Sequence, residues 1–285
     1  MDIIQVITDE LKVQKWQVEA AVKLIDEGCT IPFISRYRKE ATGSLNDEQL
    51  RTLHERLLYL RNLEDKKNQV LTSIEEQGKL TPELKKQILD AKTLVVVEDL
   101  YRPYRPKRRT RAIIAKEKGL EPLANIIMLQ MTKKPLEEEA KAFLSEEKGV
   151  ETVEDALNGA KDILAETISD EADYRIYIRD LTMKKGSVAS AAKKPEESSV
   201  YEMYYEFEEP IKKLAGHRVL ALNRGEKEKI LTVKVNAPEE EILGWLQKQV
   251  LAKDNPITTP VLREVVEDSY KRLIAPAMRG RSAAA

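Results

Sequence analysis

Residues 98–111 of this sequence concentrate cationic and aromatic side chains that could bind phosphates and bases. Six of the last ten residues of this segment are basic: Arg102, Arg105, Lys107, Arg108, Arg109 and Arg111. Tyr101 and Tyr104 lie among them. Cationic groups along an extended backbone can follow successive phosphates, and tyrosine rings can stack on bases. The segment, which we call the basic strap, therefore suits single-stranded nucleic acid.

The same residues also suit a structural role. Arginines in such a segment can pair with carboxylates of neighbouring helices while the tyrosines fill a core. Glu98 and Asp99 are carboxylates close in sequence. Pro103 and Pro106 each remove a backbone donor, so we predict an extended connector rather than a helix. The strap is either a nucleic-acid surface or an internal clamp, and its chemistry leaves both open.

A second, smaller basic element follows an apolar run. Residues 30–40 begin with Thr-Ile-Pro-Phe-Ile, where we expect Phe33 to form a buried apolar plug. Three basic residues come next, Arg36, Arg38 and Lys39. We add them to the candidate phosphate contacts.

The overall charge gives no sign of an anionic partner. The 285 residues carry a formal net charge of -1, and 34% of them are charged. The charges are segregated: residues 84–118 hold 11 basic and 4 acidic residues, whereas residues 137–173 hold 3 basic and 13 acidic ones. The two segments could pair with each other, or one could face a partner.

Most of the chain has helical periodicity. Residues 2–27 predict two short helices that end at Gly28. Asn46 and Gln49 form a capping box at the start of a helix over residues 47–77. This composition and periodicity predict a mainly α fold.

Three further segments define the second half of the chain. Thr152 caps a predicted helix whose residues Ala156, Gly159 and Ala160 are small enough for close helix packing. Residues 186–199, rich in Ser, Ala, Lys and Glu, predict a mobile connector. Residues 219–222 and 230–235 predict a small β-hairpin.

The sequence contains few residue patterns that would support a catalytic role. The two histidines, His54 and His217, and the single Cys29 lie far apart in sequence and make no zinc set. No glycine-flanked nucleophile elbow and no glycine-rich phosphate loop is present. We expect a protein that is not an enzyme and has no cofactor and no metal.

The sequence also predicts a cytoplasmic protein with no membrane contact. A single cysteine excludes an intramolecular disulfide, and the chain starts without an apolar leader. The longest aliphatic run, residues 94–97, is far too short to span a bilayer.

Several long motifs resemble one family. They are residues 28–43, the strap with its sequel 119–124, and residues 159–166, 217–226 and 270–276. In this order they resemble the N-terminal region of the bacterial Tex family of transcription accessory proteins, over residues 1–276.

The resemblance implies a multi-helix N-terminal region with a helix-turn-helix-like part. In the family this region precedes a YqgF domain of RNase H-like fold, helix-hairpin-helix elements and a C-terminal S1 domain, all expected to lie outside this chain. Family members bind nucleic acid, usually attributed to the S1 domain. RNA or single-stranded DNA is thus the expected partner of the parent protein, with RNA polymerase or ribosome-associated proteins as further candidates.

We expect three segments: a helical region over residues 1–185, a smaller mixed segment with the β-hairpin over 186–278, and a cloning remnant over 279–285. The predicted function is the helical scaffold of a nucleic-acid-binding transcription accessory protein. The alternative is a protein-interaction module in which the strap is an internal clamp.

Overall fold

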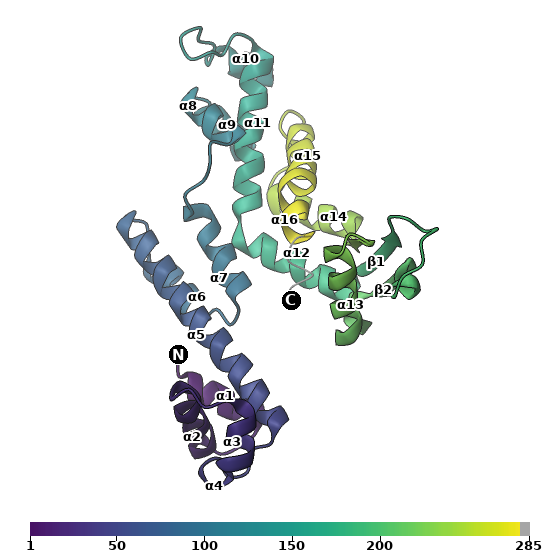
Figure 1. Ribbon diagram of the computed structural model, residues 1–285. Coiled ribbons are helices and arrows are strands. Elements are labelled where there is room, and N and C mark those ends of the chain that lie inside the picture. Colours follow the sequence, from purple (N-terminus) through teal and green to yellow (C-terminus); the bar gives the residue numbers. More distant parts are fainter. Residues whose placement is uncertain (280–285) are drawn as a thin grey trace. The chain divides into compact units, whose positions relative to one another are not determined.

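A computed structural model describes residues 1–279 of the chain, which divides into two compact units (Figure 1). Unit 1 is Met1–Tyr104, and unit 2 begins at Arg105. The division falls inside the basic strap. A domain boundary between residues 185 and 186 stays a prediction, and the predicted cloning remnant lies outside the described residues except for Arg279, the last residue of α16.

Unit 1 is entirely helical. Its helices are α1 (Ile3–Leu11), α2 (Lys15–Asp26), α3 (Ile31–Tyr37), α4 (Lys39–Thr42), α5 (Asp47–Glu76), α6 (Pro82–Asp90), α7 (Leu94–Tyr101) and the short 3-10 helix η1 (Arg102–Tyr104). The predicted pair of N-terminal helices is confirmed as α1 and α2. Gly28 follows the second with a left-handed φ of 93°, which glycine adopts without strain.

The long helix α5 organises unit 1. The predicted capping box is confirmed: the Gln49 amide donates to Asn46 Oδ1 at 2.8 Å, and the Asn46 amide donates to Gln49 Oε1 at 3.0 Å. Helices α1, α2, α3, α6 and α7 all pack against α5. Its buried apolar stripe consists of Leu50, Leu53, Leu57, Leu60, Leu63, Val70 and Ile74. At 30 residues, α5 spans about 45 Å.

One charged side chain is buried within this helical stripe. Lys67 is 2% exposed, and its Nζ donates to the carbonyl oxygen of Leu89 at 2.6 Å. Burial lowers the pKa of Lys67, while the nearby Glu64 and Asp90 carboxylates act in the opposite direction. The ammonium group thus satisfies a carbonyl in the last turn of α6, where a cation is favoured by the helix dipole.

Unit 2 combines a helical core with a small sheet. Its α-helices are α8 (Arg111–Glu117), α9 (Glu121–Leu129), α10 (Leu136–Lys141), α11 (Val153–Asp170), α12 (Ala172–Lys185), α13 (Gly216–Lys227), α14 (Glu239–Val250), α15 (Thr259–Asp268) and α16 (Ala275–Arg279). A π-helical segment, η4 (Ser269–Ile274), joins α15 to α16, and short 3-10 helices occupy Glu202–Tyr204 and Ile211–Lys213.

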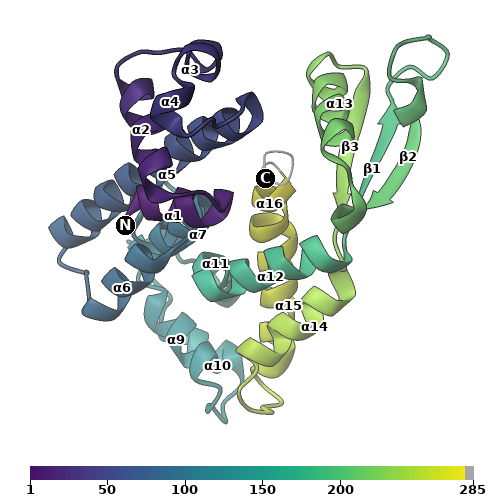
Figure 2. The ribbon, with the colours of Figure 1, turned by 90° about the horizontal axis from the view of Figure 1, so that it is seen from below.

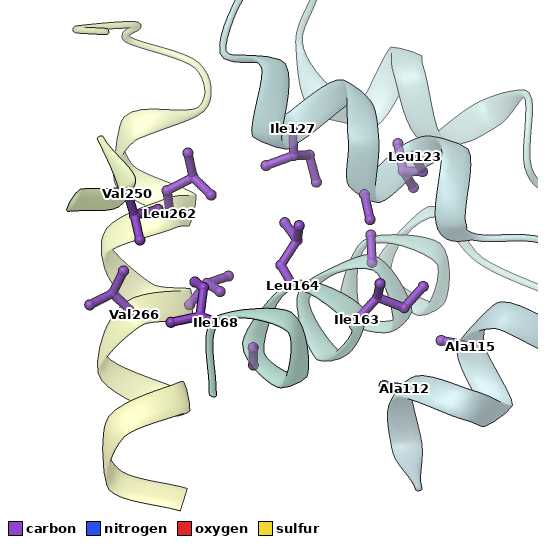
Figure 3. Close-up of a cluster of buried hydrophobic side chains, with 14 of the residues drawn as sticks. Ala112, Ala115, Leu123, Ile127, Ile163, Leu164, Ile168, Val250, Leu262 and Val266 are labelled. Atoms are coloured by element: carbon purple, nitrogen blue, oxygen red, sulfur yellow. The ribbon is translucent and has the colours of Figure 1, made fainter. Parts of the chain in front are cut away.

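Helix α11 lies at the centre of the helical core (Figure 3). Thr152 caps it as predicted, accepting a hydrogen bond from the Asp155 amide at 3.0 Å. Helices α8, α9 and α10 pack against it, and α15 and η4 also contact it. Helices α8 and α9 pack against its small-residue face. A Cβ built on Gly159 would lie 2.3 Å from Leu120 Cδ1 and 3.3 Å from Ala115 Cβ. The predicted use of this face for helix packing is confirmed.

The β structure differs from the prediction. Strands β1 (Ser187–Ala192), β2 (Glu206–Pro210) and β3 (Leu231–Asn236) form an antiparallel sheet in the order β2-β1-β3, with α13 packed against β3 (Figure 2). The register pairs Ser187 with Pro210 on one side and with Asn236 on the other.

Two predictions are therefore corrected. Residues 219–222, predicted as a strand, belong to α13, because a short apolar run fits either period. Gly225, which lies between the two predicted strands, is inside α13, where a Cβ would come within 2.5 Å of Leu231 Cδ1. The predicted mobile connector contains β1, the central strand, because pairing on both sides overrides the low β propensity of Ser and Ala.

Two helical glycines of unit 2 with opposite surroundings, Gly159 and Gly244, give a stability test. Gly159→Ala should lower the free energy of unfolding by about 1–2 kcal/mol, because the added methyl overpacks the buried contact with Leu120. Gly244→Ala, inside α14 with nothing within 4 Å of the added Cβ, should raise it by about 0.5–1 kcal/mol through helix propensity. Urea denaturation of both variants measures the two shifts, and equal shifts would contradict the packing assigned to α11.

Candidate nucleic-acid interface

The basic strap is mostly not extended, which corrects the prediction. Residues 98–101 end α7, and residues 102–104 form the 3-10 helix η1. Only residues 105–110 lie outside a helix, and Arg111 begins α8. Pro103 is tolerated because it lies two residues after Tyr101, the last residue of α7, in the single turn of η1, so its missing donor removes no hydrogen bond from α7.

The N-terminal part of the strap is fastened to α5 within unit 1. The Tyr101 hydroxyl lies 2.9 Å from Ser73 Oγ in a hydrogen bond, and Lys66 Nζ lies 5.8 Å from the centre of the Tyr101 ring. Gln77 Nε2 donates to the Tyr104 carbonyl oxygen at 2.9 Å. Arg102 is half-buried and also has a partner. These residues hold the strap, and base stacking on the two tyrosines stays a prediction.

Lys107 fastens the strap to α11 within unit 2. Its Nζ lies 3.3 Å from Glu166 Oε1 and forms a closer ion pair with Asp170. All three side chains are at least three-quarters buried, with exposed fractions of 23%, 16% and 14%. Thr110 Oγ1 donates to Glu166 at 3.4 Å and caps α8. At this point the basic segment pairs with the acidic segment, as the clamp alternative requires.

Three arginines of the strap point their charges to solvent. Arg105 and Arg108 are exposed and form no ion pair with any residue that the structure describes. Arg109 Nη2 lies 2.7 Å from Glu117 Oε2, but the side chains are 66% and 50% exposed, and such surface pairs contribute little. The charges of Arg105, Arg108 and Arg109 are therefore accessible from solvent.

Arg111 lies in a different electrostatic environment. It lines a pocket of about 380 Å³ together with Asn158, Lys161, Asp162, Glu264, Val265 and Asp268. Burial raises the pKa of the Asp162 carboxyl, while the Arg272 and Arg111 guanidinium groups act to lower it. Because three carboxylates share this pocket with the cations, Arg111 is less suited to phosphate than its neighbours in the strap.

The smaller basic element of unit 1 is exposed. Arg36, Arg38 and Lys39 all face solvent, and Glu40 Oε1 lies 4.0 Å from Arg38 Nη1. Phe33 is 39% exposed and not the buried plug that we predicted. The residue that anchors α3 is Ile34, which is fully buried, and Phe33 lies on another side of this short helix.

Sequence analysis missed Tyr37 as a candidate. Tyr37 is 65% exposed, and its ring centre lies 5.4 Å from that of Phe33 at an interplanar angle of 48°. The signal was present in the four-residue spacing of the two aromatics, which places them on neighbouring positions of a helix. The prediction of a buried Ile-Pro-Phe-Ile run hides this pairing, because it assigns Phe33 to the core.

The groups considered for catalysis remain dispersed. Among residues 1–279, no three or more His, Cys, Asp or Glu side chains are grouped so that they could hold a metal ion. His54 is half-buried on α5, His217 is exposed on α13, and Cys29 is a free, partly buried thiol. No helix within the described residues is both long and apolar enough to cross a membrane.

Comparison with known proteins shows to which family the chain belongs. Residues 1–75 match the family model "Tex-like protein N-terminal domain", and residues 130–275, half of the chain, match "Tex central region-like". The chain belongs to the Tex family. The resemblance inferred from the strap and the other motifs is thereby confirmed.

Relatives of this Tex-family chain come from bacteria and animals. It is 48% identical over 277 residues to the uncharacterized protein YdcI of Bacillus subtilis, which covers 96% of this chain and 38% of the relative. It is 42% identical over 235 residues to the transcriptional accessory protein Tex of Neisseria gonorrhoeae, covering 82% and 31%. The human S1 RNA-binding domain-containing protein 1 is 32% identical over 291 residues, covering 96% and 29%. The Tex-family chain thus spans well under half of each of these relatives.

The clamp formed by Lys107 makes a specific prediction. Lys107→Ala should lower the free energy of unfolding by about 1–3 kcal/mol, because it leaves Glu166 and Asp170 largely buried without the lysine. Arg109→Ala, which removes an exposed pair, should change it by less than about 0.5 kcal/mol. Chemical denaturation compares the two variants. A similar loss in both would show that Lys107 is no clamp.

Proposed function

We propose that this Tex-family chain is the helical scaffold of a cytoplasmic transcription accessory protein that binds RNA or single-stranded DNA. The observation that carries the proposal is the position of Arg105 and Arg108 on either side of Lys107. They are exposed and unpaired among the described residues, while Lys107 fixes the backbone between them. Cations held on an ordered backbone lose little conformational freedom when they bind phosphates.

The names of the relatives support the nucleic-acid part of the proposal. One relative is called a transcriptional accessory protein and another an S1 RNA-binding domain-containing protein. For this chain we assign the main phosphate contacts to Arg105, Arg108 and Arg109 in unit 2 and to Arg36, Arg38 and Lys39 in unit 1. Tyr101, Arg102, Tyr104, Lys107 and Arg111 hold or neighbour these contacts.

The parent protein's other properties belong to the same proposal. A role without catalysis fits the dispersed titratable groups among the described residues. Contacts with RNA polymerase or ribosome-associated proteins would follow from an accessory role. The helix-turn-helix-like part stays a prediction, and phosphate binding by the strap does not require it.

A second candidate function is a protein-interaction module whose strap is only an internal clamp. The ion pairs of Lys107 with Glu166 and Asp170 favour it. In that case the acidic side chains of residues 137–173 would face a protein partner, and Arg105 and Arg108 would contribute nothing to nucleic-acid binding. The two functions therefore differ in what removal of these arginines does.

The salt dependence of binding tests the proposal. Each phosphate neutralised on a single strand contributes about 0.7 to the log-log slope of affinity against salt concentration. Arg105→Ala/Arg108→Ala should lower the slope for labelled single-stranded RNA or DNA by about 1.4, and stability should change by less than about 0.5 kcal/mol. Fluorescence anisotropy across a salt series measures the slope.

The matched control removes two exposed lysines elsewhere in unit 2. Lys212→Ala/Lys213→Ala makes the same change in net charge on residues that lie outside the strap. The slope of this variant should stay within about 0.3 of that of the parent chain. An equal fall in both double variants would assign binding to net charge alone, and no binding by the parent chain at low salt would favour the protein-interaction module.

A further inference from the structure

Helix α3 presents two neighbouring aromatic rings to solvent. Phe33 and Tyr37 are 39% and 65% exposed, although aromatic rings contribute most when they are buried. Their centres lie 5.4 Å apart, and the Arg38 guanidinium carbon lies 5.8 Å from the centre of the Phe33 ring. The Phe33 ring therefore neighbours both the Tyr37 ring and the Arg38 guanidinium, and Tyr37 is the more accessible of the two rings.

The rings are held on an ordered helix. Thr30 caps α3, accepting a hydrogen bond from the Phe33 amide at 3.3 Å, and Pro32 fixes its first turn. Ile34 is fully buried, and α3 packs against α5. The backbone that carries Phe33 and Tyr37 is therefore fixed before any ligand binds, so little ordering remains to oppose binding.

The charges around the rings indicate what covers them. Arg36, Arg38 and Lys39 are exposed beside the two rings, with Glu40 as the acidic neighbour. This surface has a net positive charge and displays aromatic faces, whereas a surface for an apolar protein partner would be depleted in charge at its centre. Cations next to exposed rings match a ligand that alternates phosphates with flat bases.

We propose that α3 is a stacking platform for unpaired bases of a single strand, with Tyr37 and Phe33 as the stacking rings. Arg36, Arg38 and Lys39 contact the flanking phosphates. The inference rests on the proposed function and adds that unpaired bases bind directly to these rings, because the bases of a duplex are stacked on each other and cannot reach them.

Substitutions that separate ring chemistry from bulk test the platform. Tyr37→Leu keeps an apolar side chain but removes the ring, and should weaken binding of a single-stranded oligonucleotide by about tenfold. Tyr37→Phe keeps the ring and should bind within about twofold of the parent chain. Affinity for duplex DNA and the salt slope should be unchanged in both variants, whereas Arg36→Ala should lower the slope by about 0.7.

A single strand of abasic sites supplies the matched ligand control. It offers the same phosphates without bases, so the parent chain should bind it more than about tenfold more weakly than the base-bearing strand. Tyr37→Leu should show a smaller preference for the base-bearing strand than the parent chain does, because Phe33 is then the one stacking ring of α3 that remains. Circular dichroism and thermal melting of each variant verify that the fold is intact.

The outcomes distinguish the inference from the function on which it rests. If Tyr37→Leu binds single strands as tightly as the parent chain while Arg105→Ala/Arg108→Ala weakens binding, the platform is wrong and the proposed function stands. Equal binding of abasic and base-bearing strands by the parent chain would likewise overturn it. If the parent chain binds no nucleic acid, both fail. Self-association that Tyr37→Leu abolishes, with single-strand affinity unchanged, would assign the rings to a contact between copies of the chain.

Discussion

Unit 2 depends on the close approach of helices at Gly159 of α11. With no side chain there, Leu120 and Ala115 reach the helix, and both α8 and α9 can pack on one side while α15 and η4 contact α11 elsewhere. This packing fixes the position of the last two turns of α11, which carry Glu166 and Asp170. These carboxylates in turn hold Lys107, so the geometry of the strap follows from a contact between apolar side chains some distance along the helix.

Under the proposed function, one charged segment would serve two purposes. Lys107 is withdrawn from solvent and neutralised by two carboxylates, whereas Arg105 and Arg108 remain hydrated. A cation that is already paired with buried carboxylates attracts a further anion only weakly. A hydrated guanidinium keeps its full attraction for phosphate. The structural and binding interpretations of the strap therefore apply to different residues rather than excluding each other.

Local signals in the sequence predicted much of this fold. The capping box at Asn46 and the cap at Thr152 depend on side chains that accept from the backbone amide three residues on, and the small-residue face of α11 depends on spacing alone. Features decided by distant partners were not predictable: β1 is a strand because β2 and β3 pair with it, and residues 219–222 are helical because α13 covers β3. For the candidate site, composition located the basic residues. It did not show which of them form ion pairs. The prediction that Phe33 is buried was wrong, because an apolar run does not show which of its side chains face the core.

The order of strands in the sheet has a consequence for how the chain folds during synthesis. The central strand β1 is made first, and its second neighbour β3 emerges only after β2 and α13 have been completed. The helices α14 and α15, which contribute Ile242, Leu246, Leu262 and Val265 to the core around α11, follow later still. One side of α11 thus stays uncovered while more than 80 residues are translated, and contacts of such large sequence separation form slowly. The nascent unit 2 is therefore most exposed to misfolding and aggregation in the interval before α15 leaves the ribosome.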